Sequence, residues 1–111
     1  MTNYDRGRRF EWAVRDHLTA EGYDVIRSAG SKSKVDLVAL KPGQTLLVQC
    51  KRNGKCPPGE RVALLRLASY STTSVPIVAE LKDRPARISL RRLTGPRHAE
   101  WEPFTTDEVT A

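Results

Sequence analysis

The sequence predicts a mixed α/β (α+β) fold in which two helices flank one central, mixed five-stranded sheet. Three observations predict it: two segments carry apolar residues at helical spacing, shorter segments are apolar or alternate like strands, and turn residues separate them. Their order is α-β-β-β-α-β-β. Because 111 residues is the size of one ordinary domain, residues 1–111 are expected to form a single domain with an irregular tail at 94–111.

The first half of the chain predicts a helix and then three strands, at residues 5–22, 23–29, 35–41 and 45–52. Apolar residues at helical spacing mark the core side of this helix: Phe10, Ala13, Val14 and Leu18. Gly22 is the expected helix stop, and residues 30–34 form a polar, glycine-bearing turn. The Pro42-Gly43 turn predicts a hairpin between the second and third strands.

The second half predicts a helix at residues 60–72 and strands at 75–81 and 86–93. This helix is expected to turn four residues toward the core: Val62, Leu64, Leu65 and Ala68. The chain from Gly95 onward has no clear periodicity, although Thr105-x-x-Glu108 matches a capping box that would begin a short helical turn.

Positive charge dominates the chain, with a net charge of +6 and a sequence pI of about 9.7. Between residues 27 and 55, seven basic residues face a single acid, Asp36. A second basic block contains no acid: Arg84, Arg87, Arg91, Arg92 and Arg97. Clustered positive charge suits a polyphosphate backbone, because binding releases condensed counterions, but a solvated basic surface explains the charge equally well.

Composition excludes several classes of protein. No apolar run is long enough to cross a membrane, and the first residues carry no apolar signal core, so a cytoplasmic location is expected, in the host cytoplasm if the chain is phage-encoded. Cys50 and Cys56 have no further Cys or nearby His to complete a zinc set. Cys50 is therefore expected to be a core residue of its strand.

Three polar residues interrupt strands that are otherwise apolar. Asp36 lies in VDLVAL, and Gln49 and Lys51 lie in LLVQCKR. Because side chains alternate along a strand, Gln49 and Lys51 share one face, about 7 Å apart, while Cys50 lies on the other. Interior polar groups are costly without partners, so the three are expected to approach one another across paired strands.

Glu11 on the first helix can join this group. On a helical wheel it falls about 20° from Leu18, so it edges the apolar stripe. Trp12 falls on the opposite side and is either a contact surface or a partly covered surface aromatic. Carboxylate and amide oxygens with a lysine suit Mg²⁺ or Mn²⁺ and phosphate chemistry. On these residues alone, an ordinary Asp36–Lys51 ion pair remains the simpler interpretation.

Residues 5–52 resemble the archaeal-type Holliday junction resolvases of the PD-(D/E)xK nuclease superfamily. The resemblance rests on Gly7…Glu11, Arg27-Ser28-Ala29-Gly30-Ser31, Val35-Asp36 and Gln49-Cys50-Lys51. It implies a restriction-endonuclease-like nuclease domain that cuts four-way (Holliday) junctions symmetrically with Mg²⁺, for which Mn²⁺ would substitute. The implied partners are branched double-stranded DNA and a second copy of the chain in a homodimer, with no small-molecule cofactor.

The resemblance also implies roles for individual residues. Glu11, Asp36, Gln49 and the backbone carbonyl of Cys50 would bind the metal, and Lys51 would be the catalytic lysine. Ser31 matches a serine near the scissile phosphate. The residues expected to contact DNA are Arg6, Arg8, Arg9, Arg27, Lys32, Lys34, Arg52 and Lys55.

Two positions depart from the family pattern. The family usually has Glu where this chain has Gln49, which keeps an oxygen but removes one negative charge, and Trp12 replaces a residue that is often basic. Two alternatives therefore stay open: a nuclease of the same superfamily that acts on other branched DNA, and a catalytically weak or inactive DNA-binding module.

Overall fold

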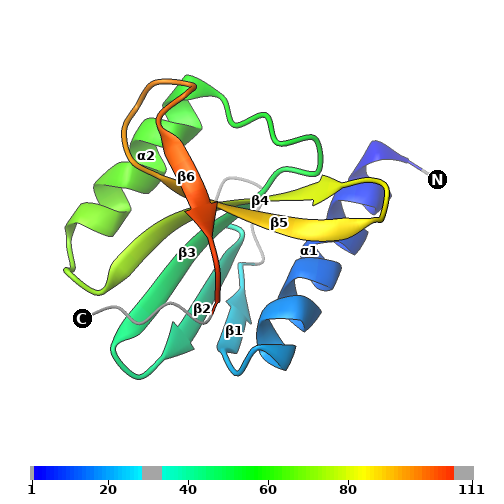
Figure 1. Ribbon diagram of the computed structural model, residues 1–111, viewed down its shortest axis with the longest axis horizontal. Helices are drawn as coiled ribbons and strands as arrows, with labels where there is room; N and C mark the ends of the chain where they lie inside the picture. The colour runs from blue at the N-terminus through cyan, green and yellow to red at the C-terminus, as the bar shows by residue number, and fades with distance from the viewer. Residues whose placement is uncertain (1, 29–33, 107–111) are drawn as a thin grey trace.

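A computed structural model describes residues 2–28 and 34–106, apart from the side chains of residues 3 and 4. Its two helices are α1 (Asn3–Ala20) and α2 (Pro58–Ser69). The strands, in chain order, are β1 (Asp24–Arg27), β2 (Leu37–Lys41), β3 (Gln44–Cys50), β4 (Ser74–Lys82), β5 (Arg87–Leu93) and β6 (Trp101–Phe104) (Figure 1).

The six strands form one mixed sheet in the order β1-β2-β3-β4-β5-β6. Neighbouring strands are antiparallel except for β3 and β4, which run parallel and are joined through α2. A parallel pair requires such a crossover, because a tight turn cannot return the chain in the same direction. The predicted mixed sheet with two flanking helices is confirmed, with one strand more than predicted.

The additional strand, β6, lies in the segment predicted to be an irregular tail. It pairs with β5, and its last residue, Phe104, is buried in the core. The other three residues of β6 are exposed, so the segment shows no apolar alternation that the sequence could have revealed. The predicted helical turn at Thr105–Glu108 lies partly outside the described residues.

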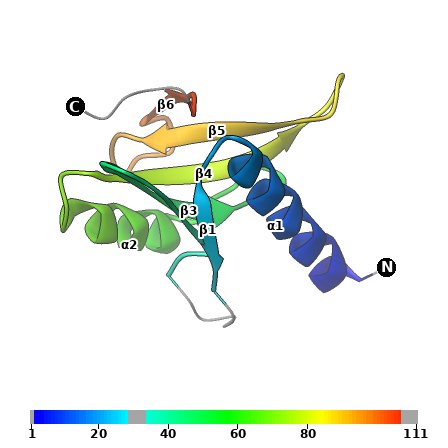
Figure 2. The same ribbon diagram turned by 90° about the horizontal axis from the view of Figure 1, so that it is seen from below.

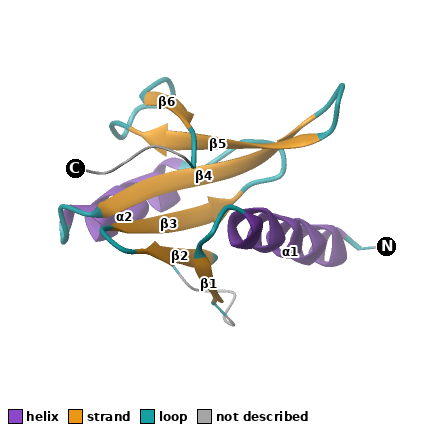
Figure 3. Cartoon of the chain, turned by 60° about the horizontal axis from the view of Figure 1, so that its bottom comes forward, coloured by secondary structure: helices purple, strands orange, loops and turns teal. Residues whose placement is uncertain are grey.

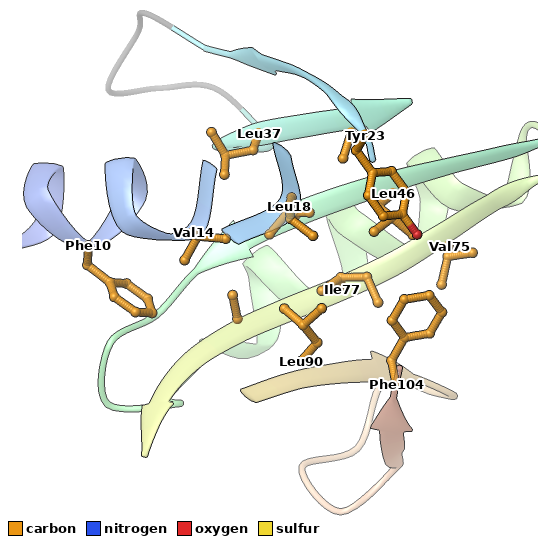
Figure 4. Packing of buried hydrophobic residues seen from close by; sticks show 13 residues of the cluster. Phe10, Val14, Leu18, Tyr23, Leu37, Leu46, Val75, Ile77, Leu90 and Phe104 are labelled. Carbon is orange, nitrogen blue, oxygen red and sulfur yellow. The ribbon is translucent and has the colours of Figure 1, made fainter. Parts of the chain in front are cut away.

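The two helices cover opposite faces of the sheet, as alternation along β3 and β4 shows (Figure 3). Phe10, Val14 and Leu18 of α1 pack on the face that carries Val48 and Ile77 (Figure 4). The other face buries a smaller cluster: Cys56, Leu64, Val78 and Leu93. Figure 2 shows α1 and α2 on either side of β1 and β3.

Two predicted core residues are exposed, Ala13 on α1 and Val62 on α2. On α2 the inward positions are taken by Arg61, Leu64 and Ala68, and Val62 keeps 44% of its surface exposed. The Arg61 guanidinium donates to the carbonyls of Cys56 and Pro96, which allows a charged group to lie where an apolar one was expected. Among the described residues, no helix is long and apolar enough to cross a membrane.

A buried ion pair fixes the loop between β3 and α2. Glu80, which is 3% exposed, accepts a hydrogen bond of 2.7 Å from Arg91 Nε, and Arg91 also donates to the Gly54 carbonyl at 3.3 Å. Gly54 has a φ of +76°, and a Cβ atom there would lie 2.1 Å from Glu80 Oε2. The loop can therefore close on the sheet only because residue 54 lacks a side chain.

Gly54→Ala is expected to destabilise the protein by about 2–4 kcal/mol, because the substitution adds a clash with Glu80 to the strain of a positive φ. Gly43→Ala is the matched control: Gly43 also has a φ of +76°, but nothing lies within 4 Å of the added Cβ. That variant should lose only about 1 kcal/mol. Urea unfolding measures both; equal losses would contradict the role of the Glu80 contact.

Candidate active site

The predicted site residues meet where β2 ends and β3 continues. The last β2–β3 pair joins Leu37 to Val48, while β3 runs on to Cys50 and pairs there with β4. The edge of β3 beside Gln49 and Cys50 therefore has no β2 residue hydrogen-bonded to it in the sheet. This gap is open to groups from both faces, and the side chain of Asp36 enters it.

Backbone contacts on both sides hold Asp36 in the gap. Its N–H donates to the Val48 carbonyl at 2.9 Å, and its carbonyl accepts from the Ser28 N–H at 2.9 Å. Its Oδ2 accepts a hydrogen bond of 2.8 Å from the Cys50 N–H. Burial raises the pKa of the Asp36 carboxyl, and the Cys50 hydrogen bond and the positive charge of Lys51 only partly oppose that rise.

Glu11 approaches the gap from α1. Its Oε1 lies 3.3 Å from Nε of Arg27, at the end of β1. Burial raises the pKa of Glu11, the negative charge of Asp36 raises it further, and Arg27 lowers it. The same two carboxylates, after burial itself, raise the pKa of the Cys50 thiol. Glu11, Asp36 and Cys50 therefore lie within electrostatic reach of one another.

Gln49 is 3% exposed and lies on the α2 face of β3, like Leu47. Its Nε2 donates a hydrogen bond of 2.5 Å to the Lys34 carbonyl, just before β2. Because the amide nitrogen of Gln49 is hydrogen-bonded to the Lys34 carbonyl, the amide oxygen is the atom that can face a cation. The Gln49 hydrogen bond also ties the segment before β2 to the end of β3.

Lys51 follows β3 and contacts a residue that the sequence analysis did not single out. Its Nζ lies 2.8 Å from Oε1 of Glu60, in the first turn of α2. The Glu60 charge also raises the pKa of Asp36. The expected Asp36–Lys51 approach is present as an electrostatic interaction, but the direct partner of Lys51 is Glu60. An acid in the first turn of a predicted helix was the only available signal, and it did not reveal the packing of α2 beside β3.

The candidate site residues approach the gap from both faces of the sheet. Glu11 reaches the gap from the α1 face, whereas Gln49 and Lys51 lie on the α2 face. Side-chain alternation within β3 was predicted correctly, since Val48 and Cys50 pack on the α1 side. The residues come together because the sheet parts at Asp36, which depends on where β2–β3 pairing stops.

The donor set fits a hard divalent cation. Partial burial raises the pKa of both half-buried carboxyls, and the negative charge of Asp36 raises that of Glu11 further, so a cation between them would relieve both burial and repulsion. The Cys50 carbonyl points toward the same edge, because Val48, two residues earlier, offers its carbonyl to Asp36. In the described part of the chain, no three His, Cys, Asp or Glu side chains gather for a metal, so the amide oxygen of Gln49 and this carbonyl would complete the set.

The residues expected to contact DNA fall into two groups around α1. Arg27 pairs with Glu11, and Lys34 is exposed beside the gap. The guanidinium of Arg8 lies 5.1 Å from the centre of the Trp12 ring, which is 39% exposed. The others are on the surface of α1 or of the β3–α2 loop: Arg6, Arg9, Arg52 and Lys55. Ser31 and Lys32 lie outside the described residues.

Comparison with known proteins agrees with this geometry. The sequence model of the archaeal Holliday junction resolvases matches residues 2–74, which include both carboxylates, Gln49, Lys51 and Glu60. The chain belongs to the archaeal Holliday junction resolvase family. The match ends at the start of β4, so β5 and β6 lie beyond the part that the family model covers.

Two relatives place the chain within this family. The crossover junction endodeoxyribonuclease Hjc of Methanocaldococcus jannaschii is 46% identical over 52 residues, which are 47% of this chain and 38% of that protein. The structure of Archaeoglobus fulgidus Hjc, a Holliday junction resolvase from an archaeal hyperthermophile, superposes with a TM-score of 0.64 at 26% identity, over 77% of this chain and 70% of that one. The chain thus spans well under half of the curated relative.

Asp36→Asn is expected to stabilise the metal-free protein at neutral pH. A carboxyl whose pKa is raised on folding gives its full stabilisation below the unfolded pKa, and that contribution is lost as pH rises through the folded pKa. The stability gained by replacing the Asp36 carboxyl with an amide should therefore become smaller toward acidic pH. Urea unfolding in chelator at acidic and neutral pH measures it, with Asp16→Asn, an exposed acid on α1, as the control. A less stable Asp36→Asn variant at neutral pH would show that the Cys50 hydrogen bond outweighs burial.

Proposed function

We propose that this chain is a divalent-metal-dependent endonuclease that cuts phosphodiester bonds symmetrically at four-way DNA junctions. The observation that carries the proposal is the meeting of Glu11 and Asp36 beside Cys50, with Lys51 on the adjoining face, in a member of the archaeal Holliday junction resolvase family. Half-buried acids with raised pKa values next to a lysine are typical of a site that handles phosphate and metal.

The residues divide the work as their chemistry dictates. Glu11, Asp36, the Gln49 amide oxygen and the Cys50 carbonyl would hold Mg²⁺, for which Mn²⁺ would substitute. When bound, the ion supplies positive charge to the phosphate and acidifies a water molecule. Lys51 would donate hydrogen bonds to the attacked phosphate and offset its developing negative charge. Arg27 keeps Glu11 directed at the gap through their ion pair.

The proposed partners follow from the symmetry of the reaction. The relative from Methanocaldococcus jannaschii is named a crossover junction endodeoxyribonuclease. A four-way junction offers two equivalent strands, so a two-fold homodimer would place one site at each. No small-molecule cofactor is part of the proposal. Such an enzyme would work in the cytoplasm, which is the host cytoplasm if the chain is phage-encoded.

The second candidate is a DNA-binding module without efficient cleavage. Gln49 favours it, because its amide carries no negative charge and its nitrogen contacts the Lys34 carbonyl. Incubation with a synthetic four-way junction and Mg²⁺ or Mn²⁺ separates the two. Paired, symmetric nicks are expected, whereas binding without cleavage in either metal would establish the module. Efficient cutting of flaps or nicked duplexes instead would indicate a nuclease for other branched DNA.

Lys51→Ala is expected to lower the cleavage rate at least about 100-fold while leaving junction affinity nearly unchanged, because the lysine acts on charge that develops during the reaction. Arg66→Ala is the control: it also removes one positive charge, but from the exposed side of α2, and the variant should cleave normally. Single-turnover cleavage and binding titrations measure the two effects. Unchanged cleavage by Lys51→Ala would remove Lys51 from the mechanism.

Gln49→Glu is expected to keep or raise activity at low metal concentration, because a carboxylate adds negative charge beside the cation. The variant must give up the amide's hydrogen bond to Lys34, so Gln49→Leu serves to separate that loss from the charge. Cleavage rates over a Mg²⁺ titration compare the three proteins. Complete inactivity of Gln49→Glu at every metal concentration would mean that Gln49 does not coordinate the ion.

A further inference from the structure

A groove on the other side of α1 from Glu11 is lined by arginines. Two adjoining hollows of about 560 and 640 Å³ share Arg6, Arg52 and Leu81 and lie between the N-terminal half of α1 and the ends of β3 and β4. Arg9, Phe10 and Ala13 line the larger one. We call this the arginine groove. Figure 1 shows the N-terminal half of α1 beside the β4–β5 hairpin, whose Asp83 also lines the groove.

The positive charge of the arginine groove exceeds the negative charge beside it: Asp83 also lines the groove, and Asp5 is within electrostatic reach of Arg9. Across residues 2–28 and 34–106, five arginines pair with acids: Arg15, Arg27, Arg91, Arg92 and Arg97. In the same ranges Arg6, Arg9 and Arg52 form no ion pair, although they converge on one hollow. Three guanidinium groups without a direct ion pair in a concave surface favour a ligand with several negative oxygens, because a guanidinium can donate two parallel hydrogen bonds to a phosphate.

The arginine groove is separated from the candidate active site by the body of α1. Glu11 lies about 140° around the helix from Arg6 and about 160° from Arg9, at about 100° per residue. The two residues after β3 also lie on different sides: Lys51 contacts Glu60 of α2 at the candidate active site, whereas Arg52 lines the arginine groove. A helix with its side chains is about 10–12 Å across. A stretch of DNA backbone bound beside Glu11 would therefore not also occupy the arginine groove.

We infer that the arginine groove binds the sugar–phosphate backbone of a second DNA segment, distinct from the segment cut beside Asp36. This inference rests on the proposed function for its choice of DNA as the ligand. Two backbone-binding surfaces on either side of α1 suit a molecule from which duplex segments diverge at one point. The groove would thus add affinity for branched DNA without adding affinity for linear DNA.

The test compares binding of a fluorescent four-way junction and a linear duplex of the same sequence, in chelator so that no cleavage occurs. The double variant Arg6→Gln, Arg9→Gln should bind the junction at least about 10-fold more weakly and the duplex almost as tightly as the unmodified protein. For the junction, the slope of log affinity against log salt concentration should become shallower by about 1–2, because up to two phosphate contacts are lost. Arg66→Gln with Arg97→Gln removes the same charge from exposed positions elsewhere and should leave both affinities near their starting values.

Arg52 lines the groove from the end of β3 and not from α1. Arg52→Gln should therefore give the same selective loss of junction affinity, which would show that the effect does not come from a change in α1 alone. Unchanged junction affinity in both groove variants would overturn the inference. An equal loss on junction and duplex would also overturn it, since the groove would then hold the other strand of the same duplex. These readouts do not require cleavage, so a protein that fails to cut any DNA would refute the proposed nuclease and still decide what the groove binds.

Discussion

The hydrogen bond from the Cys50 N–H to the Asp36 carboxylate is the interaction on which the candidate site depends. It forms because β3 extends two residues beyond its last pair with β2, which leaves the Cys50 N–H available to a side chain in place of a strand neighbour. Asp36 thereby substitutes its carboxylate for a missing backbone acceptor. One short register difference thus creates the gap, places an acid in it, and turns the Cys50 carbonyl toward the same space.

The groups around this gap are held by elements that are distant in sequence. Arg27 at the end of β1 fixes Glu11 of α1, and Glu60 at the start of α2 fixes Lys51. The loop from Lys51 to α2 includes Gly54. The Gly54 carbonyl accepts a hydrogen bond from Arg91, which is itself paired with the buried Glu80, so the loop is held against β4 and β5. The position of Lys51 therefore depends on strands that contribute no residue to the chemistry of the site.

Sequence reasoning predicted the elements and much of the site, because both depend on local patterns. Alternation in β3 placed Gln49 apart from Cys50, and the helical wheel placed Glu11 at the edge of the α1 stripe. It missed what depends on register and tertiary packing. The gap at Asp36 requires knowing where β2–β3 pairing stops, and Glu60 reaches Lys51 only through the docking of α2. β6 was missed because Phe104 alone among its residues is buried.

The gap beside Asp36 is proposed to bind a divalent cation, and calorimetric titration with Mn²⁺ in the absence of DNA tests this most directly. The unmodified chain is expected to bind Mn²⁺ at a site that both Asp36→Asn and Glu11→Gln abolish, because each substitution removes one of the two carboxylates at the gap. Retention of the same Mn²⁺ affinity in both variants would contradict the account, because the cation would then be held by residues outside the gap.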